Sequence, residues 1–283
     1  MQLKEIKIIF HEELIGIYPK EEIDSFFHMF MEHYLNMERF ALVLHPNHVI
    51  SKEAEQSFFE GLSRLKKEEP IQYILGETHF MDLRFKVDPS VLIPRPETEE
   101  LVRWAIAEIG NQNAEIKVLD IGTGSGCIAI VLAKTFPEAK VYAMDVSQEA
   151  LRVAKENARS NGVEVTFVHG DILNLNFEHQ FDVIISNPPY VREMERVEID
   201  KNVKEYEPSL ALFVPDTDPL KFYRTISMFS RKRLLPNGKL FFEINQYLAK
   251  ETQQLLVDNQ FGEVELRKDI FGNFRMLKGK LSL

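Results

Sequence analysis

Residues 117–133 read KVLDIGTGSGCIAIVLA. In the first five, Val118, Leu119 and Ile121 are typical of a short buried strand, and residues 128–133 are apolar enough for a buried helix. Between these runs, Gly122, Gly124 and Gly126 let the backbone turn tightly and approach a ligand closely. A strand, a glycine loop and a helix in this order predict a ligand site at the end of the strand. Taken alone, the loop is also compatible with a tight turn that holds no ligand.

The glycine spacing disfavours two common ligands. The dinucleotide fingerprint G-x-G-x-x-G needs its third glycine at position 127, where this chain has Cys127. A phosphate-binding P-loop ends in Gly-Lys-Ser or Gly-Lys-Thr, and neither follows here. The loop, with Thr123 and Ser125 between its glycines, therefore favours a ligand other than NAD or ATP.

Strand-like and helix-like runs alternate around this loop. The expected strands are residues 117–121, 140–144, 163–168, 181–186 and 239–244. Helices are expected over residues 148–159 and after Asp218-Pro219, and Pro236-Asn237-Gly238 is expected to turn the chain. This alternation predicts a doubly wound α/β fold with a parallel-dominated sheet. In such sheets, ligands bind beyond the carboxyl ends of the strands.

Acidic residues follow the next two strands. Asp145 ends the second strand, where a carboxylate can accept both hydroxyls of a ribose. Asp171 follows the third strand and is expected beside an adenine amino group, with Ile172 against the ring. Together with the loop these residues predict a nucleoside-containing cofactor. Alone, Asp145 also fits a capping carboxylate ahead of Ser147, and we expect Asp120 to organise the loop through backbone N–H groups.

The fourth strand runs into Asn187, Pro188, Pro189 and Tyr190. An amide or aniline-like nitrogen is a poor nucleophile, so an enzyme that transfers a group to it gains rate by holding it in line with the donor. The Asn187 side-chain oxygen and the Pro188 carbonyl can each accept one N–H, the prolines stiffen the loop, and Tyr190 can lie against a planar acceptor. No general base is required. The simpler alternative is that the prolines only break the strand.

These motifs together resemble the class I S-adenosylmethionine-dependent methyltransferases that act on planar nitrogens, and most closely the PrmC/HemK family of release factor glutamine methyltransferases. The resemblance also depends on several further segments: Tyr73-Ile74-Leu75-Gly76 with Phe80, residues 93–99 (IPRPETE), Tyr206-Glu207-Pro208 and Ala211-Leu212. It implies a Rossmann-like, seven-stranded, mostly parallel sheet with a small N-terminal helical domain. It further implies S-adenosyl-L-methionine as cofactor, and methylation of the glutamine amide in the Gly-Gly-Gln motif of class 1 peptide chain release factors.

In that family the segment with Arg95, Glu97 and Thr98 closes over the pocket, so these three residues are candidate substrate-binding residues, and Glu207-Pro208 is a candidate lid turn. Alternatively, Glu97 or Thr98 simply begins a helix. The chain departs from the family at two places. Residues 214–219 contain no glycine where the family has several, and residues 269–275 lack its usual Asp-Arg pair.

The chain before the glycine loop is expected to form two parts. Residues 1–77 have helical periodicity, with a cap at Ser51 and a stop at Gly76, and are expected to form a substrate-docking domain. Residues 78–92 alternate weakly and suggest a hairpin linker, which leaves residues 93–283 for the methyltransferase domain.

Composition limits the function further. The chain has 283 residues and 45% hydrophobic content, enough for a sizeable core. The formal net charge of -10 argues against broad binding to nucleic acid or an anionic membrane. No apolar run approaches the length of a membrane-spanning helix. The single cysteine excludes an internal disulfide, and no metal is predicted. We therefore expect a cytoplasmic protein.

Three other functions remain open. Adenine amino methylation of DNA or RNA would suit residues 187–190 equally well, although the negative charge weighs against it. A glutamine of a ribosomal protein is a closer rival acceptor. A non-catalytic cofactor-binding module is the third possibility, which the intact Asn187, Pro188 and Tyr190 disfavour.

Overall fold

The computed structural model describes residues 1–45, 47–110, 115–174 and 177–281. The chain divides into two compact units. One comprises residues 1–76 and 201–206, and the other comprises residues 77–200 and 207–283.

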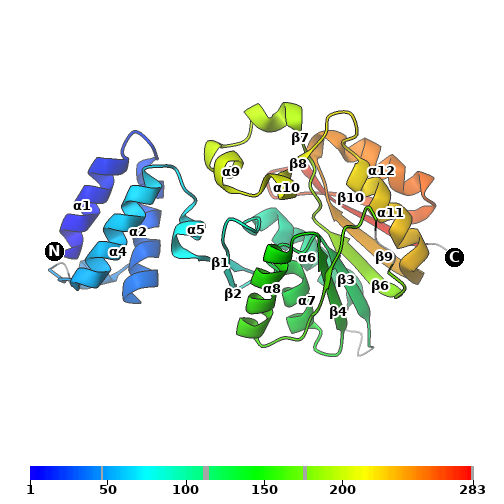
Figure 1. The fold of residues 1–283 in the computed structure, drawn as a ribbon, viewed down its shortest axis with the longest axis horizontal. Helices are drawn as coiled ribbons and strands as arrows, with labels where there is room; N and C mark the ends of the chain where they lie inside the picture. Colours follow the sequence, from blue (N-terminus) through cyan, green and yellow to red (C-terminus); the bar gives the residue numbers. More distant parts are fainter. Residues whose placement is uncertain (46, 111–114, 175–176, 282–283) are drawn as a thin grey trace. The chain divides into compact units, whose positions relative to one another are not determined.

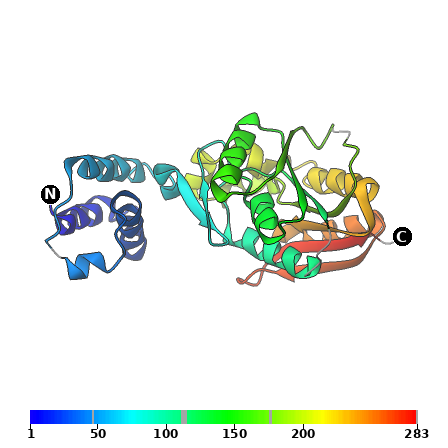
Figure 2. The ribbon, with the colours of Figure 1, turned by 90° about the horizontal axis from the view of Figure 1, so that it is seen from below.

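The first unit is helical, as its periodicity predicted. Its elements are α1 (Leu3–Leu14), α2 (Lys20–Leu35), α3 (Ala41–Leu44), α4 (Lys52–Leu65), α5 (Ile71–Leu75) and α9 (Lys201–Tyr206). Helices α1, α2 and α4 lie side by side (Figures 1 and 2) around fully buried Phe10, Phe27, Phe30 and Phe58. The rings of Phe10 and Phe27 meet edge to face with centroids 5.3 Å apart, an arrangement that aromatic pairs prefer.

The predicted helix boundaries in this unit are confirmed at two positions. The Ser51 hydroxyl accepts a hydrogen bond from the Ala54 N–H at 3.2 Å and caps α4. Gly76, with φ of 74°, ends α5 in the left-handed region.

The second unit contains a seven-stranded sheet with the order β10-β11-β9-β6-β3-β4-β5 (Figure 1). Its strands are β3 (Lys117–Ile121), β4 (Lys140–Asp145), β5 (Thr166–His169), β6 (Phe181–Ser186), β9 (Leu234–Glu243), β10 (Phe261–Lys268) and β11 (Phe274–Leu281). Only β11 runs antiparallel to its neighbours. Because β3 lies between β4 and β6, the strand order reverses beside it. The expected seven-stranded, mostly parallel sheet is confirmed.

Helices cover both faces of this sheet. Val118 of β3 packs in a core cluster with α6 (Pro96–Ile109), α7 (Cys127–Thr135) and α8 (Gln148–Asn161). The next residue, Leu119, packs in the opposite cluster with α11 (Lys221–Arg233) and α12 (Ala249–Asp258). Successive side chains of a strand point to opposite faces, so both faces of β3 are buried, and the doubly wound prediction is confirmed.

Shorter elements complete the second unit. They are β1 (Glu77–Phe80), β2 (Leu83–Lys86), β7 (Val191–Arg192), η1 (Glu193–Val197), α10 (Ser209–Leu212), β8 (Phe213–Val214) and η2 (Gln246–Leu248). Strands β1 and β2 form an antiparallel hairpin. Among the described residues, no helix has the length and apolarity needed to cross a membrane.

Two strands differ from the sequence prediction. Strand β5 begins at Thr166, three residues later than expected. Strand β9 begins at Leu234 and passes through the predicted turn. The turn residues are absorbed by an irregularity in the pairing with β6, where Phe181 faces Leu234 but Val183 already faces Lys239, and Asn237 has φ of 64°. The turn residues Pro236-Asn237-Gly238 therefore form a bulge within β9 and do not separate two elements.

Candidate active site

A cavity opens at the carboxyl ends of β3, β4, β5 and β6, where the sequence placed its motifs. Most of the predicted site residues line it: Gly122, Thr123, Gly124, Ser125, Asp145, Asp171, Ile172, Asn187, Pro188, Pro189, Arg95 and Thr98. Gly126, Tyr190 and Glu97 are not among its lining residues. Gly126 caps α7 and packs towards α8, and Glu97 lies in the first turn of α6, where a negative charge suits the helix dipole.

The glycine loop is shaped by three left-handed residues. Gly122, Gly124 and Gly126 have φ values of 75°, 54° and 83°, which other residues rarely adopt. The N–H groups of Gly122 and Thr123 both donate to the Met144 carbonyl, at 2.9 and 3.0 Å. The loop is thereby fixed to the end of β4.

Asp145 also holds this loop. Its Oδ2 accepts from the Gly124 N–H and its Oδ1 from the Ser147 N–H, both at 2.9 Å. Burial raises the pKa of this carboxyl. The Val146 N–H also bonds to this carboxylate, which with four lone pairs is still not saturated and can accept from a ligand hydroxyl. The capping interpretation was wrong, because the Ser147 hydroxyl caps α8 by accepting from the Ala150 N–H, while Asp145 holds the Ser147 N–H and lines the cavity.

Asp120 is fully buried beneath the loop. The Thr123 hydroxyl donates to Asp120 Oδ2 at 2.6 Å. The expectation of contacts with backbone N–H groups of the loop was wrong, because this side-chain hydroxyl makes the connection. Burial raises the pKa of Asp120 to about 7. It likewise raises the pKa of the neighbouring Cys127 thiol to about 12, which keeps this thiol protonated and poorly nucleophilic.

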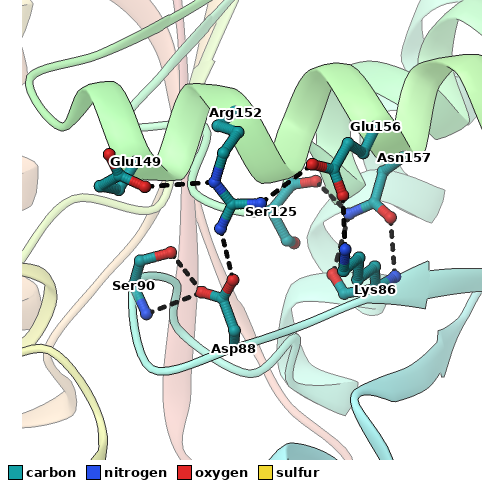
Figure 3. Close-up of polar contacts among 8 residues, drawn as sticks. All are labelled: Lys86, Asp88, Ser90, Ser125, Glu149, Arg152, Glu156 and Asn157. Carbon is teal, nitrogen blue, oxygen red and sulfur yellow. Dashed lines mark hydrogen bonds and ion pairs between the residues drawn. The ribbon is translucent and has the colours of Figure 1, made fainter.

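Helix α8 anchors the glycine loop and the segment after the β1–β2 hairpin (Figure 3). The buried Asn157 side chain donates to the Ser125 and Lys86 carbonyls at 2.9 and 3.0 Å and accepts from the Lys86 N–H at 2.7 Å. Arg152 forms an ion pair with Asp88 at 2.6 Å, and it also pairs with two glutamates of its own helix. Sequence reasoning missed Asn157, because no local pattern announces a contact between α8 and the loop.

A hydrogen-bond chain runs from Asn187 and Thr98, which line the cavity, to Glu243 and Tyr190, which do not. Asn187 Nδ2 donates to Thr98 Oγ1 at 3.2 Å, and the Thr98 hydroxyl donates to Glu243 Oε2 at 2.6 Å. The Tyr190 hydroxyl donates to the other oxygen of Glu243 at 2.9 Å. Burial raises the pKa of Glu243, and burial followed by the Glu243 charge raises the pKa of Tyr190. These hydrogen bonds join the predicted site residues Asn187, Thr98 and Tyr190 through Glu243, which was not predicted.

Glu243 was missed although its sequence carries a signal. It lies at the end of β9, in the run Leu-Phe-Phe-Glu-Ile, and only 1% of it is exposed. Charged residues are rarely fully buried without partners, so a glutamate in an otherwise apolar strand should indicate a function.

The segment before α6 is fixed by Glu207. Arg95 forms an ion pair with Glu207, whose other oxygen accepts from the Ile93 N–H at 3.1 Å. Glu207 is buried, and the adjacent Pro208 lines the cavity. The two segments that the sequence analysis singled out, residues 93–98 and 207–208, are therefore held together by Glu207, and both contribute to the lining of the cavity.

Two family models match the chain. The methyltransferase small domain matches residues 105–204, and the PrmC N-terminal domain matches residues 15–76. The release factor glutamine methyltransferase of Flavobacterium psychrophilum is 49% identical over 281 residues, which are 98% of this chain and 99% of that protein. The release factor glutamine methyltransferase of Bacteroides thetaiotaomicron is 42% identical over 277 residues, 97% of this chain and 99% of that protein.

A solved structure agrees with the fold. The crystal structure of a methyltransferase from Pyrococcus furiosus has a TM-score of 0.53 to this chain, covers 82% of it and all of its own length, and is 19% identical. This likeness concerns the fold alone.

Proposed function

The chain belongs to the release factor glutamine methyltransferase family, and from this premise we propose that it methylates the side-chain amide nitrogen of the glutamine in the Gly-Gly-Gln motif of class 1 peptide chain release factors, with S-adenosyl-L-methionine as methyl donor. The observation that carries the proposal is the placement of Asn187 and Pro188 on the same cavity as the glycine loop and Asp145. A planar nitrogen held by Asn187 and Pro188 would meet a methyl donor held by the glycine loop and Asp145.

The residues around the cavity fit this cofactor. The glycines of the loop leave its backbone open to close approach, and Asp145 retains lone pairs for the ribose hydroxyls. We assign the adenine end to Asp171 and Ile172, which line the same cavity. When bound, the cofactor supplies an electrophilic methyl group on a sulfonium.

The acceptor nitrogen is aimed by hydrogen bonds that use both of its N–H groups. In our assignment, Asn187 Oδ1 and the Pro188 carbonyl accept one N–H each, and Tyr190 supports the planar amide from the side. Holding the nitrogen in line replaces the rate that a better nucleophile would give. The nitrogen gains the methyl as the sulfonium loses it, and the proton of the methylated nitrogen then leaves to water. No side chain of the site is required as a base.

We further propose that the helical unit docks the protein substrate, because one glutamine offers too little surface for specificity. Deleting residues 1–76 should raise KM for the release factor far more than Kd for the cofactor. Equal effects on both constants would contradict this role. We also propose the cytoplasm as the compartment, since a single cysteine, which cannot form an internal disulfide, suits it.

The function is tested by methyl transfer from labelled S-adenosyl-L-methionine to a purified class 1 release factor. The same factor with its motif glutamine replaced, ribosomal proteins and an adenine-containing oligonucleotide are the comparison substrates, and Asn187→Ala is the matched enzyme control. Label on the intact factor alone, lost with either change, is the expected result. Label on the oligonucleotide or on a ribosomal protein would overturn the proposed substrate.

A further inference from the structure

We propose that Glu243, acting through Thr98, is a positioning residue that fixes which end of the Asn187 amide faces the acceptor. The inference rests on the function proposed above. It starts from an ambiguity in asparagine itself, because the oxygen and the nitrogen of its amide are nearly equal in shape but opposite in hydrogen bonding. An acceptor amide with two N–H groups can be held only if Asn187 presents its oxygen.

The hydrogen-bond chain removes this ambiguity. Thr98 has one hydroxyl proton, and it is donated to Glu243 Oε2 at 2.6 Å. The Thr98 oxygen can then only accept from Asn187, so Nδ2 of the amide turns towards it, at 3.2 Å. Because the amide is planar, Oδ1 points away from Thr98 and is left for the substrate.

The opposite arrangement becomes possible when the carboxylate is lost. If the Thr98 hydroxyl were free to donate to Asn187, the amide would rotate and turn its NH2 group towards the substrate NH2 group. Two donors would then face each other. Water cannot easily take the place of Glu243, because Thr98 is 3% exposed and Glu243 is 1% exposed.

The same carboxylate also fixes Tyr190. Its second oxygen accepts from the Tyr190 hydroxyl at 2.9 Å, so both oxygens of Glu243 are occupied by O–H donors. One buried acid on β9 thus sets the orientation of two residues of the loop after β6. Against the burial that raises the pKa of Glu243, these two O–H donors and the charge of Arg275 favour its ionised form, and hydrogen bonds to a charged group are strong enough to hold such an arrangement.

The test compares Thr98→Val with Thr98→Ser. Valine keeps the shape but removes the oxygen, whereas serine keeps the hydroxyl. We expect T98V to lower kcat roughly tenfold or more, the effect of losing one hydrogen bond to a charged network, with KM for the release factor and Kd for the cofactor nearly unchanged. T98S should restore most of kcat. Equal losses in both variants, or a parallel loss of cofactor binding, would overturn the proposal.

Glu243→Gln tests the carboxylate directly. With glutamine, either Thr98 or Tyr190 must accept instead of donate, so kcat should fall in the wild-type background and fall less in the T98V background. Fully additive effects would show that Glu243 does not act through Thr98. Thermal unfolding of each variant separates these effects from a loss of folding.

A readout without catalysis distinguishes this inference from the proposed function. In the wild-type protein, the side-chain NH2 protons of Asn187 should show a nuclear Overhauser effect to the Thr98 methyl group, and E243Q should weaken it. If the wild-type enzyme fails to methylate the release factor but keeps this signal, the substrate assignment fails and the positioning survives. If the signal is absent from the wild-type protein, the positioning fails whatever the substrate.

Discussion

Raising the pH should destabilise the wild-type protein relative to Asp120→Asn. Burial raises the pKa of Asp120 from its ordinary value of 3.8 to about 7, against a smaller opposing effect of the Thr123 hydroxyl. Between these two values the folded state keeps a proton that the unfolded state releases. The stability from this group is therefore complete below the unfolded pKa and is lost as the pH rises through the folded pKa.

The expected size follows from the two pKa values. One unit of pKa difference is worth ~1.36 kcal/mol. A rise from 3.8 to about 7 thus makes wild type lose about 4 kcal/mol of unfolding free energy relative to D120N across this range. Asparagine is the matched substitution because it has nearly the same size, keeps an oxygen for Thr123 and does not ionise.

The assay is urea unfolding of both proteins at several pH values between about 4.5 and 7.5, a window that should contain about 3 kcal/mol of this change. Trp104, the single tryptophan, is buried in α6, so its fluorescence reports on the unit that contains Asp120. The hydrogen bond from Thr123 lowers the pKa of Asp120. Thr123→Val removes it, so the pKa should rise further and the pH dependence should become larger. A difference between wild type and D120N that stays constant with pH would refute the reasoning.

Other perturbations test the packing around the site and in the helical unit. Gly61→Ala would place a Cβ only 2.1 Å from Cε1 of the Phe30 ring, so it should destabilise the helical unit by about 1–3 kcal/mol in thermal unfolding while cofactor Kd stays constant; a stabilised unit would contradict the packing. Asn157→Ala removes the amide that holds the Ser125 carbonyl and should weaken cofactor binding by roughly tenfold in calorimetry, whereas an unchanged Kd would show that the loop holds itself. Glu207→Gln removes a charge from the ion pair with Arg95 and should raise KM for the release factor several-fold, about 1 kcal/mol, with little change in cofactor Kd. A raised cofactor Kd with an unchanged KM would show that this carboxylate supports cofactor binding.

The sequence predicted the parts of the site that depend on local pattern. The glycine loop, Asp145 and residues 187–190 each follow a short apolar strand directly, and parallel strands bring their carboxyl ends to one edge of a sheet. Chain direction and strand order were therefore enough to place them around one cavity.

Glu243 depends on long-range pairing and could not be placed in this way. Strands β6 and β9 are parallel neighbours, with Ser186 opposite Phe242, so the residues that follow each strand emerge together. This register brings Glu243 near Asn187 across more than fifty residues of sequence. Because the pairing includes the irregularity after Leu234, periodicity alone would have given the wrong alignment.

Asp120 and Asp145, near the carboxyl ends of β3 and β4, should also make ligand binding depend on pH. Asp120 is fully buried beneath the glycine loop and Asp145 is partly buried, burial raises the pKa of both, and the charge of Asp145 adds to the shift of Asp120. Placing a cation in the cavity should favour the ionised forms of Asp145, which lines it, and of Asp120 beneath the loop, and by linkage a positively charged ligand should bind more tightly as the pH rises towards 7. The methyl donor and its demethylated product differ by the sulfonium charge but share the same amino and carboxyl groups. The ratio of their affinities, measured by calorimetry between about pH 5.5 and 7, should therefore shift towards the donor with rising pH. A ratio independent of pH would mean that the two carboxylates serve the loop alone and do not sense the charge that the reaction removes.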